Sequence, residues 1–79
     1  MRVLLFAGLA DAAGMRAVEL EDVHTATVAE IKRRIAERFP QSGPIVASCV
    51  AAINHKYAAD DSLVSESDEI ALIPPVSGG

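Results

Sequence analysis

Residues 27–40, TVAEIKRRIAERFP, are the most strongly patterned stretch of the sequence, and they predict the helix around which the fold is organised. Thr27 and Glu30 have the spacing of a capping box, in which the threonine hydroxyl accepts a hydrogen bond from the Glu30 N–H and the glutamate side chain reaches back. Pro40 ends the helix, because proline disfavours a helical conformation in the residue before it. Apolar side chains recur at spacings of three and four, so one face is predicted to pack on a sheet. These side chains are Val28, Ile31, Ile35 and Phe39.

Short apolar runs on both sides of this helix predict the strands of that sheet. Residues 2–7, RVLLFA, are apolar throughout and predict a central strand buried on both faces. Residues 15–22 alternate between apolar and polar and predict a half-exposed strand, hairpinned to the first. Residues 48–54 and 69–75 predict two later strands, and Pro74 marks the end of the last because proline cannot donate to a ladder.

The remaining segments are predicted to connect these elements. Residues 8–14 form a loop or a single helical turn with a glycine stop at Gly14. Asn54 tolerates positive φ and begins a turn that leads into a very short strand and a further turn over residues 57–62. Residues 40–44 and 65–69 are an irregular connection and a polar loop. The order strand, strand, helix, strand, short strand, strand predicts an α+β domain with one main helix across one face of a sheet.

The composition predicts one small domain that folds without a disulfide bond or a structural metal. Cys49 is the one cysteine, so no internal disulfide can form, and with only two distant histidines no four-ligand zinc site can be assembled. This favours a reducing compartment, and we predict a cytoplasmic protein. We assign residues 1–73 to the folded domain and residues 74–79 to a flexible C-terminal tail.

Neither a membrane nor a nucleic acid is predicted as a partner. The longest uncharged apolar runs fall short of the ~20 residues that span a bilayer, and MRVLLFAGLA at the start is interpreted as a strand, not a signal peptide. The net charge is −4, whereas phosphate binding requires clustered cations. The one basic cluster, residues 32–38, contains Glu37 and follows Glu30, which favours a solvated helix face.

No ordinary active site is evident among the side chains. His24 and His55 are predicted at the surface, and Cys49 lies in an apolar run, where a buried thiol is expected. No phosphate-binding loop, GxSxG or HExxH motif is present. Five of the acidic residues fall in predicted turns and are interpreted as solvated. They are Asp60, Asp61, Glu66, Asp68 and Glu69.

The last six residues, PPVSGG (74–79), have properties of their own. Pro74 and Pro75 stiffen the exit from the last strand in an extended conformation. Gly78 and Gly79 have no side chains and could enter a channel in which any Cβ would clash. The carboxylate of Gly79 becomes a reactive electrophile only when activated, for example as an acyl-adenylate made from ATP. The alternative is a frayed end or a cloning remnant without function.

This tail and the order of elements resemble the ubiquitin-like β-grasp proteins, and within them the MoaD family of small molybdopterin synthase subunits. The resemblance covers the whole chain. Its most specific residues are Asp68-Glu69, Pro74-Pro75-Val76 and Gly78-Gly79, and Ser77 stands where family members commonly have Thr or Ser. The chain departs from many members at Leu72 and Ile73, where aromatic residues are frequent.

The resemblance implies a sulfur carrier in molybdenum cofactor biosynthesis. A MoeB-like enzyme would consume ATP to adenylate Gly79, and sulfur would then replace the adenylate to give a thiocarboxylate. The tail would insert into a MoaE-like large subunit, in a heterotetramer, where sulfur passes to a cyclic pterin precursor. The chain itself would bind no cofactor or metal. The large subunit would supply the catalytic side chains, so whether this subunit counts as an enzyme is left open.

The resemblance also assigns roles to individual residues. Gly79 would bear the sulfur as the reacting residue, and Gly78 would keep the tail slim. The residues expected to contact the partner along the tail are Pro74, Pro75, Val76 and Ser77. Phe6, Leu72 and Ile73 are expected to form an apolar docking patch at the root of the tail, with burial in the core as the alternative.

Three other functions stay open on the sequence. A ThiS-like sulfur carrier would serve thiamine synthesis, cysteine synthesis or tRNA thiolation and would share the Gly-Gly end. A protein modifier would join Gly79 to lysines of target proteins by the same activation. A plain interaction domain would have a tail without a function.

Overall fold

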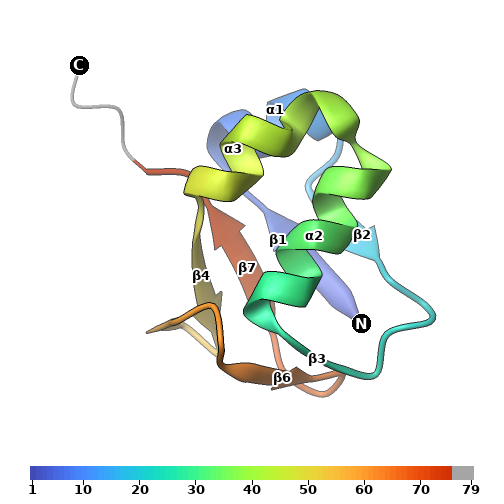
Figure 1. Cartoon of the computed structure of the whole chain (residues 1–79), viewed down its shortest axis with the longest axis vertical. Coiled ribbons are helices and arrows are strands. Elements are labelled where there is room, and N and C mark those ends of the chain that lie inside the picture. Colours follow the sequence, from blue (N-terminus) through green and yellow to red (C-terminus); the bar gives the residue numbers. More distant parts are fainter. Residues whose placement is uncertain (76–79) are drawn as a thin grey trace.

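The computed structural model of the chain describes residues 1–75 and contains two sheets and three α-helices there (Figure 1). In chain order the elements are β1 (Arg2–Leu5), α1 (Ala7–Ala13), β2 (Ala17–Glu19), β3 (Thr25–Thr27), α2 (Val28–Arg38), a 3₁₀ turn η1 (Pro40–Ser42), α3 (Gly43–Ser48), β4 (Val50–Ile53), β5 (Lys56–Ala58), β6 (Leu63–Ser65) and β7 (Ile70–Ile73). Within these residues no helix is both long and apolar enough to span a bilayer. The division at residue 73 into domain and tail stays a prediction.

The main sheet has five strands in the order β2-β1-β7-β4-β5. β1 and β7 run parallel, while β1–β2, β7–β4 and β4–β5 are antiparallel, so the sheet is mixed. The helices cover one face of this sheet, with α2 lying across it (Figure 1). The predicted α+β architecture and the predicted first hairpin, β1–β2, are confirmed.

The core lies between the sheet and the helices. Every second strand residue points toward the helices, as strand geometry requires. Leu72 is paired with Leu5 on one side and Ala51 on the other, and all three are buried. Ile31 and Ile35 of α2 are fully buried against this layer, as their spacing predicted. Each such side chain contributes about 1.5–3 kcal/mol on burial, so this layer dominates stability.

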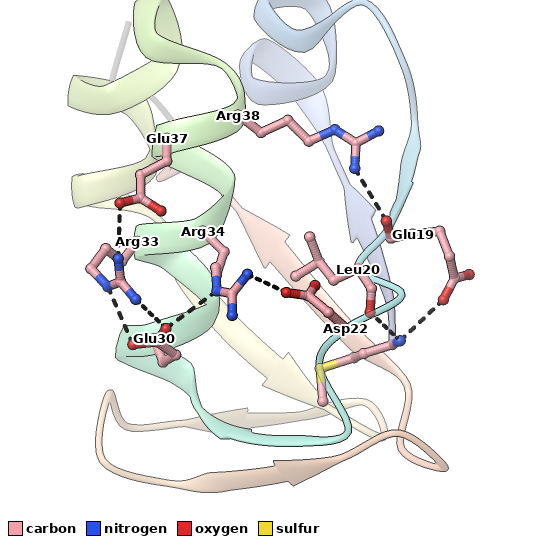
Figure 2. Close-up of polar contacts among 9 residues, drawn as sticks. Glu19, Leu20, Asp22, Glu30, Arg33, Arg34, Glu37 and Arg38 are labelled. Atoms are coloured by element: carbon pink, nitrogen blue, oxygen red, sulfur yellow. Dashed lines mark hydrogen bonds and ion pairs between the residues drawn. The ribbon is translucent and has the colours of Figure 1, made fainter.

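Helix α2 begins and ends where the sequence predicted. Thr27 is the N-cap, and its hydroxyl accepts a hydrogen bond from the Glu30 N–H at 3.2 Å. The Glu30 side chain does not reach back to Thr27 as the capping box predicted. Its carboxylate instead accepts hydrogen bonds from Arg33 and Arg34 (Figure 2). The helix ends at Arg38, two residues before Pro40.

Exposed polar contacts connect α2 to the last residue of β2 and to the segment after it (Figure 2). Arg34 Nη1 donates to Asp22 Oδ2 at 2.8 Å, and Arg38 Nη1 donates to the Glu19 carbonyl at 3.2 Å. The Met1 ammonium donates to the Leu20 carbonyl at 2.8 Å and so joins the start of β1 to the end of the same hairpin. Exposed ion pairs contribute about 0–1 kcal/mol each, so this network orients α2 but adds little to stability.

Four local predictions were wrong. Residues 2–7 do not form a strand buried on both faces, because β1 ends at Leu5 and Arg2 and Phe6 are exposed. Residues 40–44 are not an irregular connection, because η1 begins at Pro40 and α3 has Pro44 in its first turn. Proline is tolerated in a first turn, since the N–H that it lacks would have no partner in the helix there. Residues 8–13 belong to α1, which is longer than a single turn, and its stop at Gly14 (φ 76°) was predicted correctly. The small β3–β6 sheet was missed, since each of its strands has only three residues.

The N-cap gives a direct test of how α2 is held. Thr27→Ala removes the acceptor for the Glu30 N–H and is expected to lower the free energy of unfolding by about 1 kcal/mol. Urea unfolding followed by circular dichroism would measure this, with Thr27→Ser as the matched control that keeps the hydroxyl. Equal stability of the alanine and serine variants would contradict the assignment.

Candidate functional site at the root of the tail

The chain leaves the fold from the central strand of the main sheet. Because β1 and β7 are parallel, their carboxyl ends lie at the same edge. β4 is antiparallel to β7 and begins there, with Val50 opposite Ile73. The segment after Ile73 is therefore flanked by the end of β1 on one side and the start of β4 on the other (Figure 1).

Two prolines begin the tail. Pro74 is half-buried and Pro75 is exposed. Neither has an N–H, and the ring fixes φ, so the sheet ladder stops and the exit is restricted to extended conformations. Val76, Ser77, Gly78 and Gly79 lie outside the described residues, so their assigned roles stay predictions.

The face of the sheet turned away from the helices carries apolar side chains near this exit. One row of paired residues crosses the sheet from Leu4 to Tyr57, with the small residues Ala71 and Ala52 between them. In the neighbouring row, Val50 is paired with Ile73. Tyr57 is 81% exposed, Phe6 45% and Val50 43%. We call Leu4, Phe6, Val50, Tyr57 and Ile73 the outer-face patch. Exposed apolar groups gathered in this way are typical of an interaction surface.

A shallow hollow of about 340 Å³ lies within the outer-face patch. Phe6, Tyr57 and Ile73 provide apolar walls, while His55 and Glu69 lie at its rim. The His55 Nε2 and a Glu69 carboxylate oxygen are 3.3 Å apart. An apolar floor with polar groups at the edge resembles the anatomy of protein interfaces.

The structure separates the three residues expected at the tail root. Phe6 is at the surface, directly before Ala7, whose φ of 51° turns the chain from β1 into α1. Ile73 is half-buried. Leu72 is fully buried in the core, so it is not part of the exposed patch that we expected. A docking role for Phe6 and Ile73 stays a prediction.

Sequence reasoning missed Val50 and Tyr57. The run 48–54 was interpreted as one apolar strand, and its alternation was obscured because the outward positions are filled by Val50 and the small Ala52. Tyr57 follows the turn at Asn54 and His55, which have φ of 51° and 70°. A two-residue turn of this kind fixes the register of the hairpin, and that register could have placed Tyr57 opposite Ala52.

A polar clamp fixes the start of β7. Asp68 Oδ2 accepts a hydrogen bond from the Ser65 N–H at 2.9 Å, and Asp68 Oδ1 accepts one from Asn54 Nδ2 at 3.0 Å. The Asn54 side-chain oxygen accepts in turn from the Glu69 N–H at 2.9 Å. The Ser65 N–H first, and then the Asn54 amide, hold the pKa of Asp68 below its ordinary value. The clamp thus joins the turns at the opposite end of β7 from the tail.

The described residues offer no conventional catalytic centre. No group of three metal-ligating side chains comes together within residues 1–75. Burial raises the pKa of the Cys49 thiol, which opposes a nucleophilic role. The His24 ring and Glu66 lie 2.7 Å apart at the surface, and this hydrogen bond lowers the pKa of Glu66. The tail and the surface around its root stay the candidate site.

The basic cluster on α2 is occupied by intramolecular acceptors. Lys32 Nζ donates to the Cys49 carbonyl at 2.7 Å and lies 3.1 Å from an Asp60 carboxylate oxygen. Arg33 pairs with Glu30 and Glu37. The predicted solvated helix face is confirmed for Arg33, whose side chain is 55% exposed, but not for Lys32, whose side chain is only 14% exposed.

A mixed sheet with parallel central strands, covered by helices on one face, defines the ubiquitin-like β-grasp class. Solved structures support this. SAMP1 from Haloferax volcanii is 31% identical with a TM-score of 0.82, covering 100% of this chain and 98% of that chain. The small archaeal modifier protein 1 (SAMP1) from Methanosarcina acetivorans is 26% identical with a TM-score of 0.81, covering 99% and 94%.

The family model described as "ThiS family" matches residues 3–79, and the chain belongs to that family. The Molybdopterin synthase sulfur carrier subunit of Arabidopsis thaliana is 32% identical over 79 residues, covering 100% of this chain and 82% of that protein. The subunit of the same name from Haemophilus influenzae is 32% identical over 81 residues, covering 100% and 99%. The family resemblance stated from the sequence is confirmed.

The clamp makes a prediction about pH. Because the folded pKa of Asp68 is lowered, its contribution to stability is present above the unfolded value of about 3.9 and is lost as pH falls through the folded value. Asp68→Asn should therefore be less stable than the natural chain at pH 7, and the difference should shrink below about pH 4. Urea unfolding across this range measures it, with the exposed Asp61→Asn as control. A difference that does not change with pH would contradict the clamp.

Proposed function

We propose that this chain is the sulfur carrier subunit for molybdopterin synthesis, with Gly79 as the residue that bears the sulfur. The observation that carries the proposal is the full-length similarity to several curated proteins that share the name Molybdopterin synthase sulfur carrier subunit. The geometry supports it, because the chain leaves the main sheet from its central strand β7 and apolar side chains surround that exit.

The proposed chemistry takes place in two steps at the Gly79 carboxylate. A carboxylate oxygen attacks the α-phosphorus of ATP and releases pyrophosphate, which leaves an acyl-adenylate. A hydrosulfide equivalent from a sulfur donor then attacks the carbonyl carbon, AMP leaves, and a thiocarboxylate remains. A MoeB-like enzyme catalyses the first step, so ATP is consumed there and this chain holds no cofactor.

Transfer of the sulfur requires a second protein. The thiocarboxylate sulfur attacks a carbon of a cyclic pterin precursor that carries an oxygen substituent, and the carbon–oxygen bond breaks as the oxygen leaves. Water then attacks the Gly79 carbonyl carbon and cleaves the bond to sulfur, which leaves the sulfur on the pterin and restores the carboxylate. A MoaE-like large subunit supplies the catalytic groups, and two carriers serve two large subunits in a heterotetramer. Two transfers give the dithiolene. The related Helicobacter pylori fold is described as a protein–protein complex of subunits 1 and 2 of molybdopterin-converting factor, which supports such a partner.

The outer-face patch is the proposed contact with the large subunit. It adjoins the tail, and Phe6, Val50 and Tyr57 expose apolar surface there. Removal of this surface from water on binding would be favourable. Aromatic anchors in such a patch commonly provide much of the binding energy. We place the assembly in the cytoplasm, where the single thiol Cys49 stays reduced.

A second function is supported by a specific observation. The H. volcanii small archaeal modifier protein 1 is 30% identical to this chain with a TM-score of 0.79. In a protein modifier, a lysine amine of a target attacks the same adenylate and forms an isopeptide bond as AMP leaves. Conjugates of this chain in cell extract, detected by their branched Gly-Gly remnant on lysine, would favour this function over sulfur transfer.

The carboxyl terminus is the point at which the proposal can be tested. Addition of one alanine after Gly79 moves the carboxylate away from its proposed place and should abolish molybdopterin formation by the reconstituted carrier, large subunit and activating enzyme. Gly78→Val should reduce it strongly, because a branched side chain prevents threading of the tail. Ser77→Thr, a conservative change, is the control. Full activity of the extended chain would contradict the mechanism.

A further inference from the structure

The sequence contains two lysines, Lys32 and Lys56, and the fold leaves only one of their amines accessible. Lys32 Nζ donates a hydrogen bond to the Cys49 carbonyl at 2.7 Å and lies 3.1 Å from an Asp60 carboxylate oxygen. Its side chain is 14% exposed, and its contact with Asp60 is the one lysine ion pair among residues 1–75. The Lys32 amine is therefore enclosed by its own chain.

Lys56 is the accessible lysine. It is exposed, and it begins β5, which lies at the edge of the main sheet and has a neighbouring strand on one side only. The remaining amine of residues 1–75, the Met1 ammonium, is buried and donates to the Leu20 carbonyl at 2.8 Å. Within the part of the chain that the structure describes, Lys56 is thus the one amine open to other molecules.

Lys56 lies at the end of the sheet opposite to the tail. It pairs with Ile53 of β4, and Ile53 pairs with Ile70, the first residue of β7. The tail follows Ile73, the last residue of β7. A molecule attached to Lys56 would therefore leave the tail free, and a molecule bound to the tail would leave Lys56 free.

We infer that Lys56 of one copy of the chain is the acceptor for the activated Gly79 of another copy when no sulfur donor is present. This inference rests on the proposed adenylation of Gly79. The unprotonated Lys56 amine attacks the carbonyl carbon of the acyl-adenylate, AMP leaves, and the nitrogen loses a proton as the isopeptide bond forms. ATP is the one co-reactant, and the step needs neither an oxidant nor a reductant.

The geometry favours a link between two copies over a link within one. The tail leaves Ile73 in the direction away from Lys56, and the rings of Pro74 and Pro75 restrict its first two residues to extended conformations. To reach its own Lys56, the chain would have to reverse direction within the four residues after Pro75, which extend to at most about 14 Å. The tail of a second copy needs no such reversal.

The link would join the copies head to tail. Each copy offers Gly79 as the donor and Lys56 as the acceptor, and the two lie on different parts of its surface. A contact of this kind does not close on itself as a two-fold contact does, so further copies can be added to either end. A sulfur donor would compete with Lys56 for the same adenylate, and its presence should suppress the link.

The experiment incubates the natural chain, with a verified terminus, with ATP and a purified MoeB-type enzyme but without a sulfur donor. Intact mass and a denaturing gel should show a linked dimer, with the mass of two chains less one water, and digestion should give a branched peptide that joins Gly79 to Lys56. Lys56→Arg keeps the charge and should lose the dimer. Lys32→Arg is the matched control and should form as much dimer as the natural chain.

The outcomes separate this inference from the proposed function. Hydroxylamine traps the adenylate as a hydroxamate, and pyrophosphate release measures its formation. Adenylation without a dimer, an undiminished dimer in Lys56→Arg, or a single chain that has lost one water would each overturn the inference, while sulfur transfer from Gly79 stands. Attachment of Gly79 only to lysines of the enzyme would overturn it as well.

Failure of the first step has a different meaning. If the natural chain supports no pyrophosphate release with an enzyme shown to be active, the proposed function fails and this inference fails with it. A sulfur donor added to the same mixture should lower the yield of dimer as the thiocarboxylate appears, and a yield that does not change would contradict competition for one adenylate. Circular dichroism and urea unfolding confirm that each variant is folded.

Discussion

The structure depends on the burial of β7 between β1 and β4. Ile70 and Leu72 are fully buried, and their cross-strand partners on both sides belong to the same core. About 1.5–3 kcal/mol per buried side chain makes this layer the main source of stability, while the exposed ion pairs of α2 contribute about 1 kcal/mol or less each. Because the parallel partner β1 ends beside β7, the chain emerges at the centre of one edge and is surrounded there by other elements.

This constraint gives the tail a rigid base. The Asp68–Asn54–Ser65 clamp fixes one end of β7, and Pro74 and Pro75 end its ladder at the other. The surface around the exit is apolar on both sides of the sheet. The outer-face patch lies on one side, and Ala7, Pro44 and Ile45 line a hollow on the other. On the proposed function, the chemistry takes place at the terminal residue and other proteins recognise the surface around the root of the tail.

Much of this was accessible from the sequence. The capping residue, the apolar stripe and Pro40 predicted α2, the alternation of residues 15–22 predicted the hairpin, and Asn54 predicted a turn with positive φ. Local sequence signals gave wrong predictions where tertiary contacts determine the burial or the conformation of a residue. Leu72 and Ile73 are adjacent apolar residues, and only the register of β7 shows that Leu72 belongs to the core. Pro40 and Pro44 stand in the first turns of η1 and α3, where a proline is tolerated because the N–H that it lacks would have no partner in the helix anyway. The three-residue strands β3 and β6 are too short for a periodic pattern.

The central claim is that Gly79 accepts sulfur, and the intact mass of the protein tests it most directly. The natural chain would be incubated with ATP, a MoeB-type enzyme and a sulfur donor, and then analysed whole and after digestion. The account predicts a mass gain equal to the replacement of one oxygen by sulfur, located at Gly79 and absent when ATP is omitted. An unchanged mass, with an enzyme shown to be active and a terminus shown to be Gly79, would contradict it.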